Sequence, residues 1–107
     1  ASSASTYGDG ANGFGTDPKT TRSLRPLSPY AQSKHDVDRW FLQTDYWKNV
    51  VGLKFFNVYG KPEDEAHKGR SASLVGRIAE AIHADRPVTL YDVQAARDFV
   101  HVDDAVD

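Results

Sequence analysis

The stretch VVGLKFFNVYG, residues 50–60, decides the fold class of this 107-residue chain. Its first part, residues 50–56, is a short run of apolar, β-branched and aromatic side chains with little polar alternation. Such a run is typical of a strand that is covered on both faces and pairs in parallel within a layered sheet. The sequence therefore predicts a buried strand of an α/β protein over residues 50–56, followed by a loop over residues 57–70.

A helix is predicted on each side of this strand. Ser28 and Pro29 have the pattern of a helix start, with the serine hydroxyl as N-cap and the proline in the first helical position, and the helix should run to about Trp47. Four of its side chains fall on one narrow stripe of the helix surface: Tyr30, Lys34, Val37 and Phe41. A second helix is predicted from Ser71 to about Ala84.

Two more short strands complete the predicted pattern, near residues 88–91 and 98–102. Alternation of strands and helices favours βαβ units with right-handed crossovers. Asp103 and Asp104 follow the last strand, and we expect them to cap the next helix rather than to bind a metal.

The glycine-rich segment YGDGANGFG, residues 7–15, contains the spacing G-x-G-x-x-G. A dinucleotide fingerprint requires a strand that enters the glycines and a helix that leaves them, so that free N–H groups point at the phosphates. No helical period follows the glycines, and we predict no helix there. Residues 9–27 are interpreted as a functional loop or a disordered segment, not as a cofactor fingerprint.

Composition excludes several classes of protein and site. The net charge of −2 gives no basic footprint for nucleic acid or an anionic membrane surface. The chain has no cysteine, which excludes disulfides, thiolate metal sites and a cysteine nucleophile, and its four histidines lack the paired spacing of a zinc site. No apolar run is long enough to span a membrane, so we expect a cytoplasmic protein without bound metal.

Tyr30 and Lys34 are the first candidates for chemistry, because one helical turn separates them and places both on the same face. A free phenol loses its proton only near pH 10, and a neighbouring ammonium favours the phenolate, which makes it a usable acid or base. The same spacing is also common in an ordinary packed pair. The pair alone leaves both interpretations open.

Four segments in this order resemble the catalytic region of the extended short-chain dehydrogenases/reductases, a family of nucleotide-sugar epimerases, dehydratases and related enzymes. The segments are ASSASTYG at 1–8, SPYAQSK at 28–34, KFFNVYG at 54–60 and RDFVHVDD at 97–104. The resemblance implies a fragment of a Rossmann-like, doubly wound parallel sheet with part of the smaller substrate domain. Residues 1–107 would be the catalytic middle portion, with the dinucleotide fingerprint half and the C-terminal remainder outside the chain. We expect these residues alone to be poorly soluble or associated, and inactive.

The resemblance also implies roles for individual residues. Ser3 would hydrogen-bond the reacting hydroxyl or carbonyl of the sugar, Tyr30 would be the catalytic acid or base, and Lys34 would hold the nicotinamide ribose. Asn57 would contact the substrate and Val58 the cofactor, which is NADP or NAD. Arg97 would contact the nucleotide part of the substrate, and the full-length protein would be a homo-oligomer.

The segment His67-Lys68-Gly69 is similar to the branch of the family that epimerises a nucleotide-activated heptose, a precursor of the lipopolysaccharide core. In that branch Lys68 is implied as a second catalytic base opposite Tyr30. Inverting an unactivated sugar carbon requires transient oxidation to a ketone, and its two faces suggest two proton carriers. Without the resemblance, Lys68 is better explained as a solvated lysine that balances neighbouring carboxylates.

The substrate remains open among several classes. Ser71-Ala72-Ser73, Tyr91-Asp92-Val93 and Arg77 depart from the heptose pattern in segments implied to face the substrate. Arg70, together with Arg77, could clamp a diphosphate at a helix N-terminus or be exposed. The alternatives are another epimerase, such as one acting at C4 of a UDP-sugar, or a noncatalytic member that binds a nucleotide sugar or a partner protein. A dehydratase is disfavoured, because Ala4-Ser5 stands where such enzymes place an acidic pair.

Overall fold

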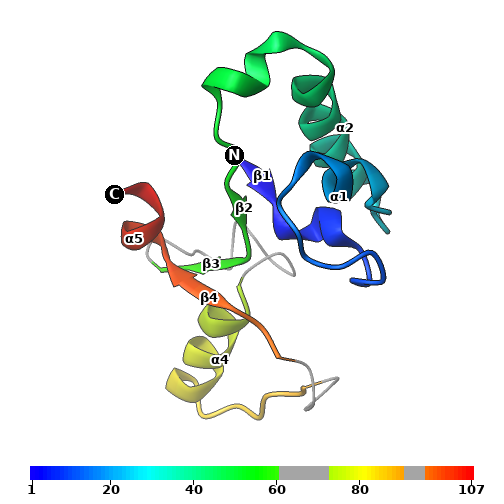
Figure 1. The fold of residues 1–107 in the computed structure, drawn as a ribbon. Helices are drawn as coiled ribbons and strands as arrows, with labels where there is room; N and C mark the ends of the chain where they lie inside the picture. Colours follow the sequence, from blue (N-terminus) through cyan, green and yellow to red (C-terminus); the bar gives the residue numbers. More distant parts are fainter. Residues whose placement is uncertain (61–72, 91–95) are drawn as a thin grey trace. The chain divides into compact units, whose positions relative to one another are not determined.

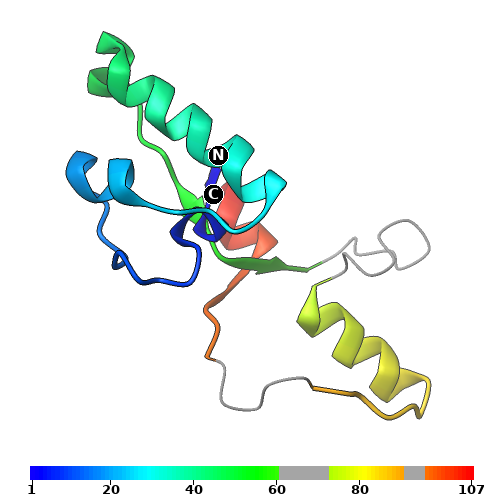
Figure 2. The ribbon, with the colours of Figure 1, turned by 90° about the vertical axis from the view of Figure 1, so that its right-hand side faces the viewer.

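A computed structural model of the chain describes residues 1–60, 73–90 and 96–107 (Figures 1 and 2). These residues form two compact units, one over residues 1–55 and one over residues 56–107. Each unit combines helices with one pair of parallel strands. Mixed helices and parallel strands are consistent with a Rossmann-like α/β fragment. Among the described residues, no helix is both long enough and apolar enough to cross a membrane.

The first unit is built on the parallel pair of β1 and β2. In chain order its elements are β1 (Ser2–Ser3), η1 (Ala4–Tyr7), α1 (Pro18–Ser23), α2 (Pro29–Gln43), η2 (Asp45–Asn49) and β2 (Lys54–Phe55), where η marks a 3₁₀ helix. Ser2 lies opposite Lys54, and the Ser2 N–H donates to the carbonyl of Leu53 at 2.9 Å. Helix α2 packs against β1, η1 and α1, so the longest helix of the unit covers the start of the chain (Figure 1).

Helix α2 begins where its cap predicts. The Ser28 hydroxyl accepts a hydrogen bond from the Ala31 N–H at 3.1 Å, and Pro29 is the first helical residue. The predicted end at Trp47 is wrong by four residues. Thr44 is extended, with φ −111° and ψ 161°, and a 3₁₀ turn follows it.

The predicted stripe of α2 is not its buried face. Ala31 and His35 are buried at 1% and 3% exposure, whereas Tyr30 and Val37 are 58% and 50% exposed. Ala31 and His35 are also separated by one turn, so they define a neighbouring face that packs within the unit. Tyr30 therefore remains accessible on a well-anchored helix.

The segment after the glycines contains a helix that the sequence analysis did not predict. Helix α1 opens at Pro18, with the Asp17 carboxylate accepting from the N–H groups of Lys19 and Thr20 at 2.9 and 3.0 Å. The prediction of no helix was wrong because this six-residue helix is too short and polar to show an apolar period. The glycines themselves form turns, with the Gly10 N–H on the Tyr7 carbonyl at 3.0 Å.

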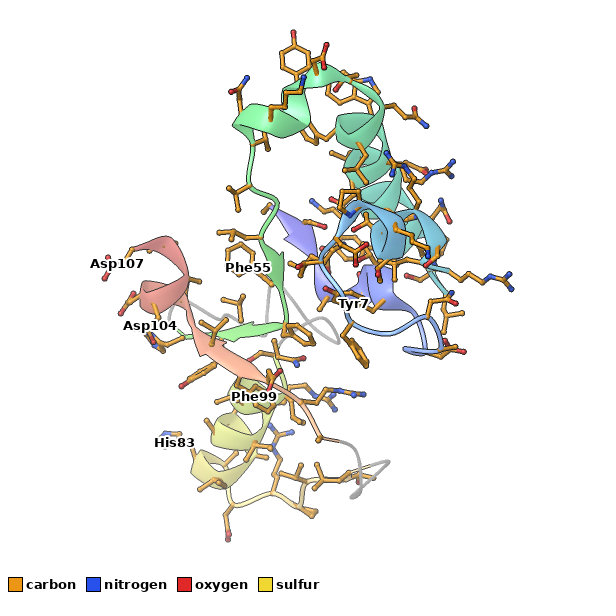
Figure 3. The ribbon with its side chains drawn as sticks, viewed as in Figure 1. Tyr7, Phe55, His83, Phe99, Asp104 and Asp107 are labelled. Atoms are coloured by element: carbon orange, nitrogen blue, oxygen red, sulfur yellow. The ribbon has the colours of Figure 1, made fainter. Side chains whose placement is uncertain are left out.

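The second unit is built on the parallel pair of β3 and β4. Its elements are β3 (Asn57–Tyr59), α4 (Leu74–His83), β4 (Phe99–His101) and α5 (Val102–Val106). Asn57 lies opposite Phe99 and Tyr59 opposite His101, and α5 contacts both strands. In Figure 3 the side chains of Phe99 on β4 and His83 at the end of α4 mark these elements. The strand predicted at residues 98–102 is thereby confirmed.

Several predicted boundaries are wrong. Residues 54–55 alone form a strand within the predicted run 50–56, and β3 begins inside the predicted loop. Val51 is 84% exposed, so the first half of the run is not covered on both faces in this structure. No strand forms at residues 88–90, and Tyr91 lies outside the described residues.

The helix starts in the second unit also differ from the prediction. Helix α4 begins at Leu74 rather than Ser71, because Ser73 is the N-cap and accepts from the Gly76 N–H at 3.0 Å. Helix α5 is capped by His101, whose Nδ1 accepts from the Asp103 N–H at 3.3 Å. Asp103 and Asp104 therefore lie in the first turn and are not the cap.

Candidate active site

Tyr30 and Lys34 lie together on α2 as their spacing predicts. The Lys34 Nζ lies 6.0 Å from the centre of the Tyr30 ring. Lys34 is half-buried, while the phenol is 58% exposed. The structure thus presents one hydroxyl and one ammonium on the same helix face, both reachable by a ligand.

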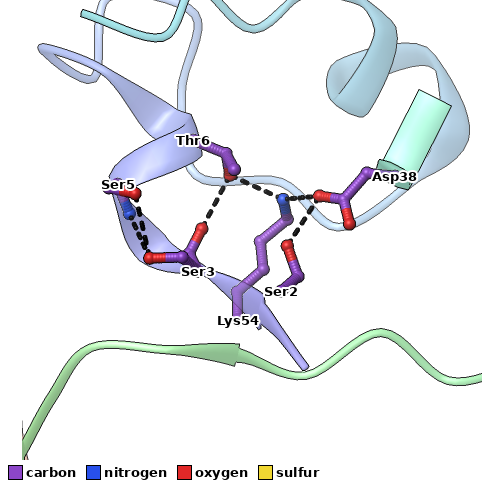
Figure 4. Close-up of polar contacts among 6 residues, drawn as sticks. All are labelled: Ser2, Ser3, Ser5, Thr6, Asp38 and Lys54. Carbon is purple, nitrogen blue, oxygen red and sulfur yellow. Dashed lines mark hydrogen bonds and ion pairs between the residues drawn. The ribbon is translucent and has the colours of Figure 1, made fainter. Parts of the chain in front are cut away.

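Ser3 is the N-cap of η1 and is held in an extended conformation, with φ −150° and ψ 143°. Its Oγ accepts from the N–H of Ser5 at 3.2 Å and from the hydroxyl of Ser5 at 2.9 Å (Figure 4). A hydroxyl has two lone pairs and one proton, so these two bonds leave the Ser3 proton available for another acceptor. Ser3 ends β1, and α2, the helix that carries Tyr30, packs against both β1 and η1.

A buried polar cluster beside Ser3 was not predicted from the sequence. The Lys54 Nζ donates to the Asp38 Oδ2 at 2.6 Å and to the Thr6 Oγ at 2.7 Å, and the Ser2 hydroxyl donates to the same carboxylate oxygen at 2.7 Å (Figure 4). The side chains of Lys54 and Asp38 are only 12% and 14% exposed. The sequence could have indicated this cluster, because Lys54 interrupts an apolar run and a buried cation requires a partner.

Three side chains in the first unit have shifted pKa values, those of Tyr7, Asp17 and His35. Burial raises the pKa of the Tyr7 phenol, and the negative charge of Asp38 adds to this effect. Burial also lowers the pKa of His35, and the positive charge of Arg39 acts in the same direction. Tyr7, which ends η1 (Figure 3), lies with its ring centre 5.2 Å from the Lys54 Nζ. Tyr7 therefore stays protonated, and its ring faces the buried cation.

The second unit places the other described candidates on β3, on α4 and before β4. The Asn57 side-chain amide donates to the Asp98 carbonyl at 3.0 Å, so in this structure it ties β3 to the segment before β4. Val58 is half-buried in the middle of β3. Arg77 and Arg97 are exposed. Lys68, Arg70 and Tyr91 lie outside the described residues, so their predicted roles stay predictions.

The described residues contain no group of three or more histidine and carboxylate side chains that could hold a metal ion. The donors that they do offer near Ser3 and Tyr30 are hydroxyls and an ammonium. Such groups suit polar, hydroxyl-rich ligands and proton transfer.

Comparison with known proteins identifies the family. All of residues 1–107 match the NAD dependent epimerase/dehydratase family. The chain belongs to this family. Two relatives named ADP-L-glycero-D-manno-heptose-6-epimerase, from Brachyspira hyodysenteriae and Fusobacterium nucleatum, are each 42% identical over 99% and 100% of this chain. A third of the same name, from Nitratidesulfovibrio vulgaris, is 37% identical over 100% of it.

This member of the family spans about a third of the length of those relatives, 34% or 35% in each case. No solved structure matches it. The family match confirms the resemblance that the four ordered segments indicated, and the relatives' names agree with the branch suggested by the His67-Lys68-Gly69 segment.

Proposed function

We propose that the protein containing this chain is a nucleotide-sugar epimerase that inverts C6 of ADP-glycero-manno-heptose through a transient keto sugar. The family of the chain and the names of its relatives support this function. The observation that carries it is the placement of Tyr30 beside Lys34, on a helix packed against the turn that Ser3 caps. In the full-length protein these residues would belong to the catalytic middle of a doubly wound sheet with a smaller substrate domain.

The described residues fit a nicotinamide cofactor. The Lys34 ammonium has three donors and no acceptor, which suits the paired hydroxyls of a ribose, and the exposed Tyr30 hydroxyl lies beside it. Val58 would contact the cofactor through its apolar side chain. When bound, the cofactor, NADP in this proposal, supplies the oxidation and the return of reducing equivalents that inversion requires.

Proton movements then fall to the chain's own side chains. The positive charge of Lys34 favours the phenolate form of Tyr30, which takes the proton of the reacting hydroxyl and becomes the neutral phenol. The free proton of Ser3 points to a donor role, in which its hydroxyl stabilises the carbonyl oxygen of the keto sugar. Lys68 would act as the second base at the opposite face of the sugar.

Substrate recognition would use the remaining candidates. Arg70 and Arg77 would bind the diphosphate, Arg97 the nucleotide, and Asn57 and Tyr91 the sugar. Guanidinium groups suit this task because their fixed N–H pairs match phosphate oxygens.

The test is turnover of ADP-D-glycero-D-manno-heptose by the full-length protein, with NADP or NAD supplied separately and the two C6 epimers separated by chromatography. We expect the epimer ratio to move toward equilibrium, and Tyr30→Phe to lower kcat by about 10²- to 10⁴-fold. A Tyr30→Phe/Lys68→Met double variant should abolish turnover. An unchanged epimer ratio with the wild type would remove the heptose function, and equal turnover in the double variant would remove the two-base mechanism.

Two further measurements distinguish the proposed function from a C4 epimerase and from a noncatalytic binding protein. Turnover of UDP-galactose without turnover of the heptose would assign the protein to the C4 epimerases. Binding of a nucleotide sugar without turnover of either would assign it to noncatalytic binders.

A further inference from the structure

A chain of hydrogen bonds joins the buried Lys54–Asp38 ion pair to the backbone of Ser3. The Lys54 Nζ donates to the Thr6 Oγ at 2.7 Å, and the Thr6 hydroxyl donates to the Ser3 carbonyl at 2.8 Å (Figure 4). On the other side of Ser3, the Ser2 hydroxyl donates to the Asp38 carboxylate at 2.7 Å. The residue before Ser3 and the carbonyl of Ser3 are thus both tied to the same ion pair.

The direction of this chain follows from the chemistry of its members. An ammonium can only donate, so the Thr6 hydroxyl must accept from Lys54 and has its own proton left for the Ser3 carbonyl. An ionised carboxylate can only accept, so the Ser2 hydroxyl must donate to Asp38. Each hydrogen bond therefore has only one possible donor and one possible acceptor. As a result, the cluster favours a single arrangement of the turn that Ser3 caps.

Because the cluster is buried, the ion pair contributes little net stability to the fold. Thr6 is fully buried, and the two charged side chains are 12% and 14% exposed. Removing two charges from water costs about as much as their attraction returns, and an apolar replacement of such a pair is often neutral or stabilising. What the pair adds beyond packing is directional contacts that join β2 and α2, which carry its two members, to Ser2 on β1 and Thr6 on η1.

We propose that the Lys54–Asp38 ion pair positions the hydroxyl of Ser3. Through its contacts with Thr6 and Ser2, the pair fixes the place of this hydroxyl relative to the helix that carries Tyr30. This role rests on the function proposed above, in which the Ser3 hydroxyl touches the reacting oxygen of the sugar. Asp38 is two turns beyond Tyr30 on α2, so the ion pair links the turn directly to that helix.

The test uses Lys54→Met in the full-length protein, with Lys48→Met as the matched control. Lys48 forms an exposed pair with Asp45 at 3.0 Å in the same unit, with side chains 60% and 94% exposed. We expect Lys54→Met to lower kcat by about 10- to 100-fold, because small misplacement of a catalytic group has effects of that size, with KM changed less than about threefold. Lys48→Met should leave both constants within about twofold.

Two double variants separate positioning from general stabilisation. If Lys54 acts through Ser3, the kcat losses of Lys54→Met and Ser3→Ala should not multiply in the double variant. Lys54→Met/Asp38→Asn should recover thermal stability relative to Lys54→Met, because it leaves no unpaired buried carboxylate, without recovering kcat. Multiplying losses, or recovery of kcat along with stability, would overturn the positioning role.

Crystal structures of the full-length wild type and Lys54→Met supply a measurement that needs no substrate. The variant is expected to lose the Thr6 bond to the Ser3 carbonyl and to shift the Ser3 Oγ relative to α2. A displaced Ser3 in a protein whose wild type turns over no nucleotide sugar would remove the proposed function and keep the positioning role. An unmoved Ser3, with or without wild-type activity, would overturn it.

Discussion

At the scale of single residues, burial changes what a side chain can do. His35 is 3% exposed, and its Nδ1 has no hydrogen-bond partner among the described residues. Burial and the charge of Arg39 lower its pKa, so the folded state holds the neutral imidazole. His35 is thus a structural group that resists protonation, although it directly follows the candidate catalytic segment 28–34.

The lowered pKa of His35 predicts loss of stability in mild acid. Below about pH 6.5, the unfolded chain binds a proton that the folded chain excludes. The free energy of unfolding should therefore fall as the pH drops from about 6.5 toward the lower folded pKa, and His35 should contribute no pH dependence above that window. Urea unfolding of the full-length protein, as wild type and as His35→Leu, between pH 5 and 8 measures this. Parallel pH curves for the two proteins would show that another group is responsible.

Gly8 and Gly13 offer a matched pair for backbone strain. Both have positive φ, +63° and +78°, but a Cβ at Gly8 would lie 2.2 Å from the Arg25 carbonyl oxygen, whereas one at Gly13 would meet no atom within 4 Å. We expect Gly13→Ala to destabilise by about 1 kcal/mol through the backbone alone, and Gly8→Ala by more than about 2 kcal/mol. Equal losses in urea unfolding of the full-length protein would mean that the chain moves away at Gly8 without cost.

At the scale of elements, capping decides where helices begin, and tertiary contacts decide which face they bury. Ser28, Asp17 and Ser73 each accept hydrogen bonds from N–H groups of the first turn. These contacts span two or three residues, so a short sequence is enough to specify them. The buried face of α2, by contrast, depends on packing against β1 and η1, which come from a distant part of the chain.

Ser28→Ala tests the cap of α2. Loss of the 3.1 Å bond from the Ala31 N–H should cost about 1 kcal/mol of unfolding free energy, and Ser28→Asp should retain stability because aspartate caps equally well. Since α2 carries Tyr30 two residues after the cap, Ser28→Ala should also lower turnover by the full-length protein more than Ser28→Asp does. Equal stabilities for the two variants would show that packing, rather than the cap, sets the start of α2.

At the scale of the whole molecule, the described residues bury little apolar surface. The buried hydrophobic side chains among them are Tyr7, Leu24, Ala31 and Ala81. Many large apolar side chains are exposed, among them Val51 at 84% and Val106 at 76%. So few buried groups offset only a small part of the conformational entropy lost by each unit on folding.

The isolated 107-residue chain should accordingly unfold without a sharp transition. We expect a broad, weak heat-absorption profile in calorimetry and strong binding of a hydrophobic dye at room temperature, because the exposed apolar side chains remain accessible. The full-length protein serves as the control and should show a cooperative transition. A sharp transition for the isolated chain, with no dye binding, would contradict this prediction.

The sequence by itself determined the local features of this protein. The start of α2, the adjacency of Tyr30 and Lys34, the strand at residues 99–101 and the family follow from spacings of a few residues and from the order of four segments. Capping and helical spacing act between near neighbours in the chain, so they can be predicted without knowledge of the rest of the fold.

Only the tertiary structure decided the surroundings of Ser3. The ion pair of Lys54 with Asp38 spans 16 positions, the bond of Ser2 to Asp38 spans 36, and that of Lys54 to Thr6 spans 48. It likewise decided that His35, and not Tyr30, faces inward. Contacts over such separations depend on how helices and strands pack, and no local spacing in the chain records that packing.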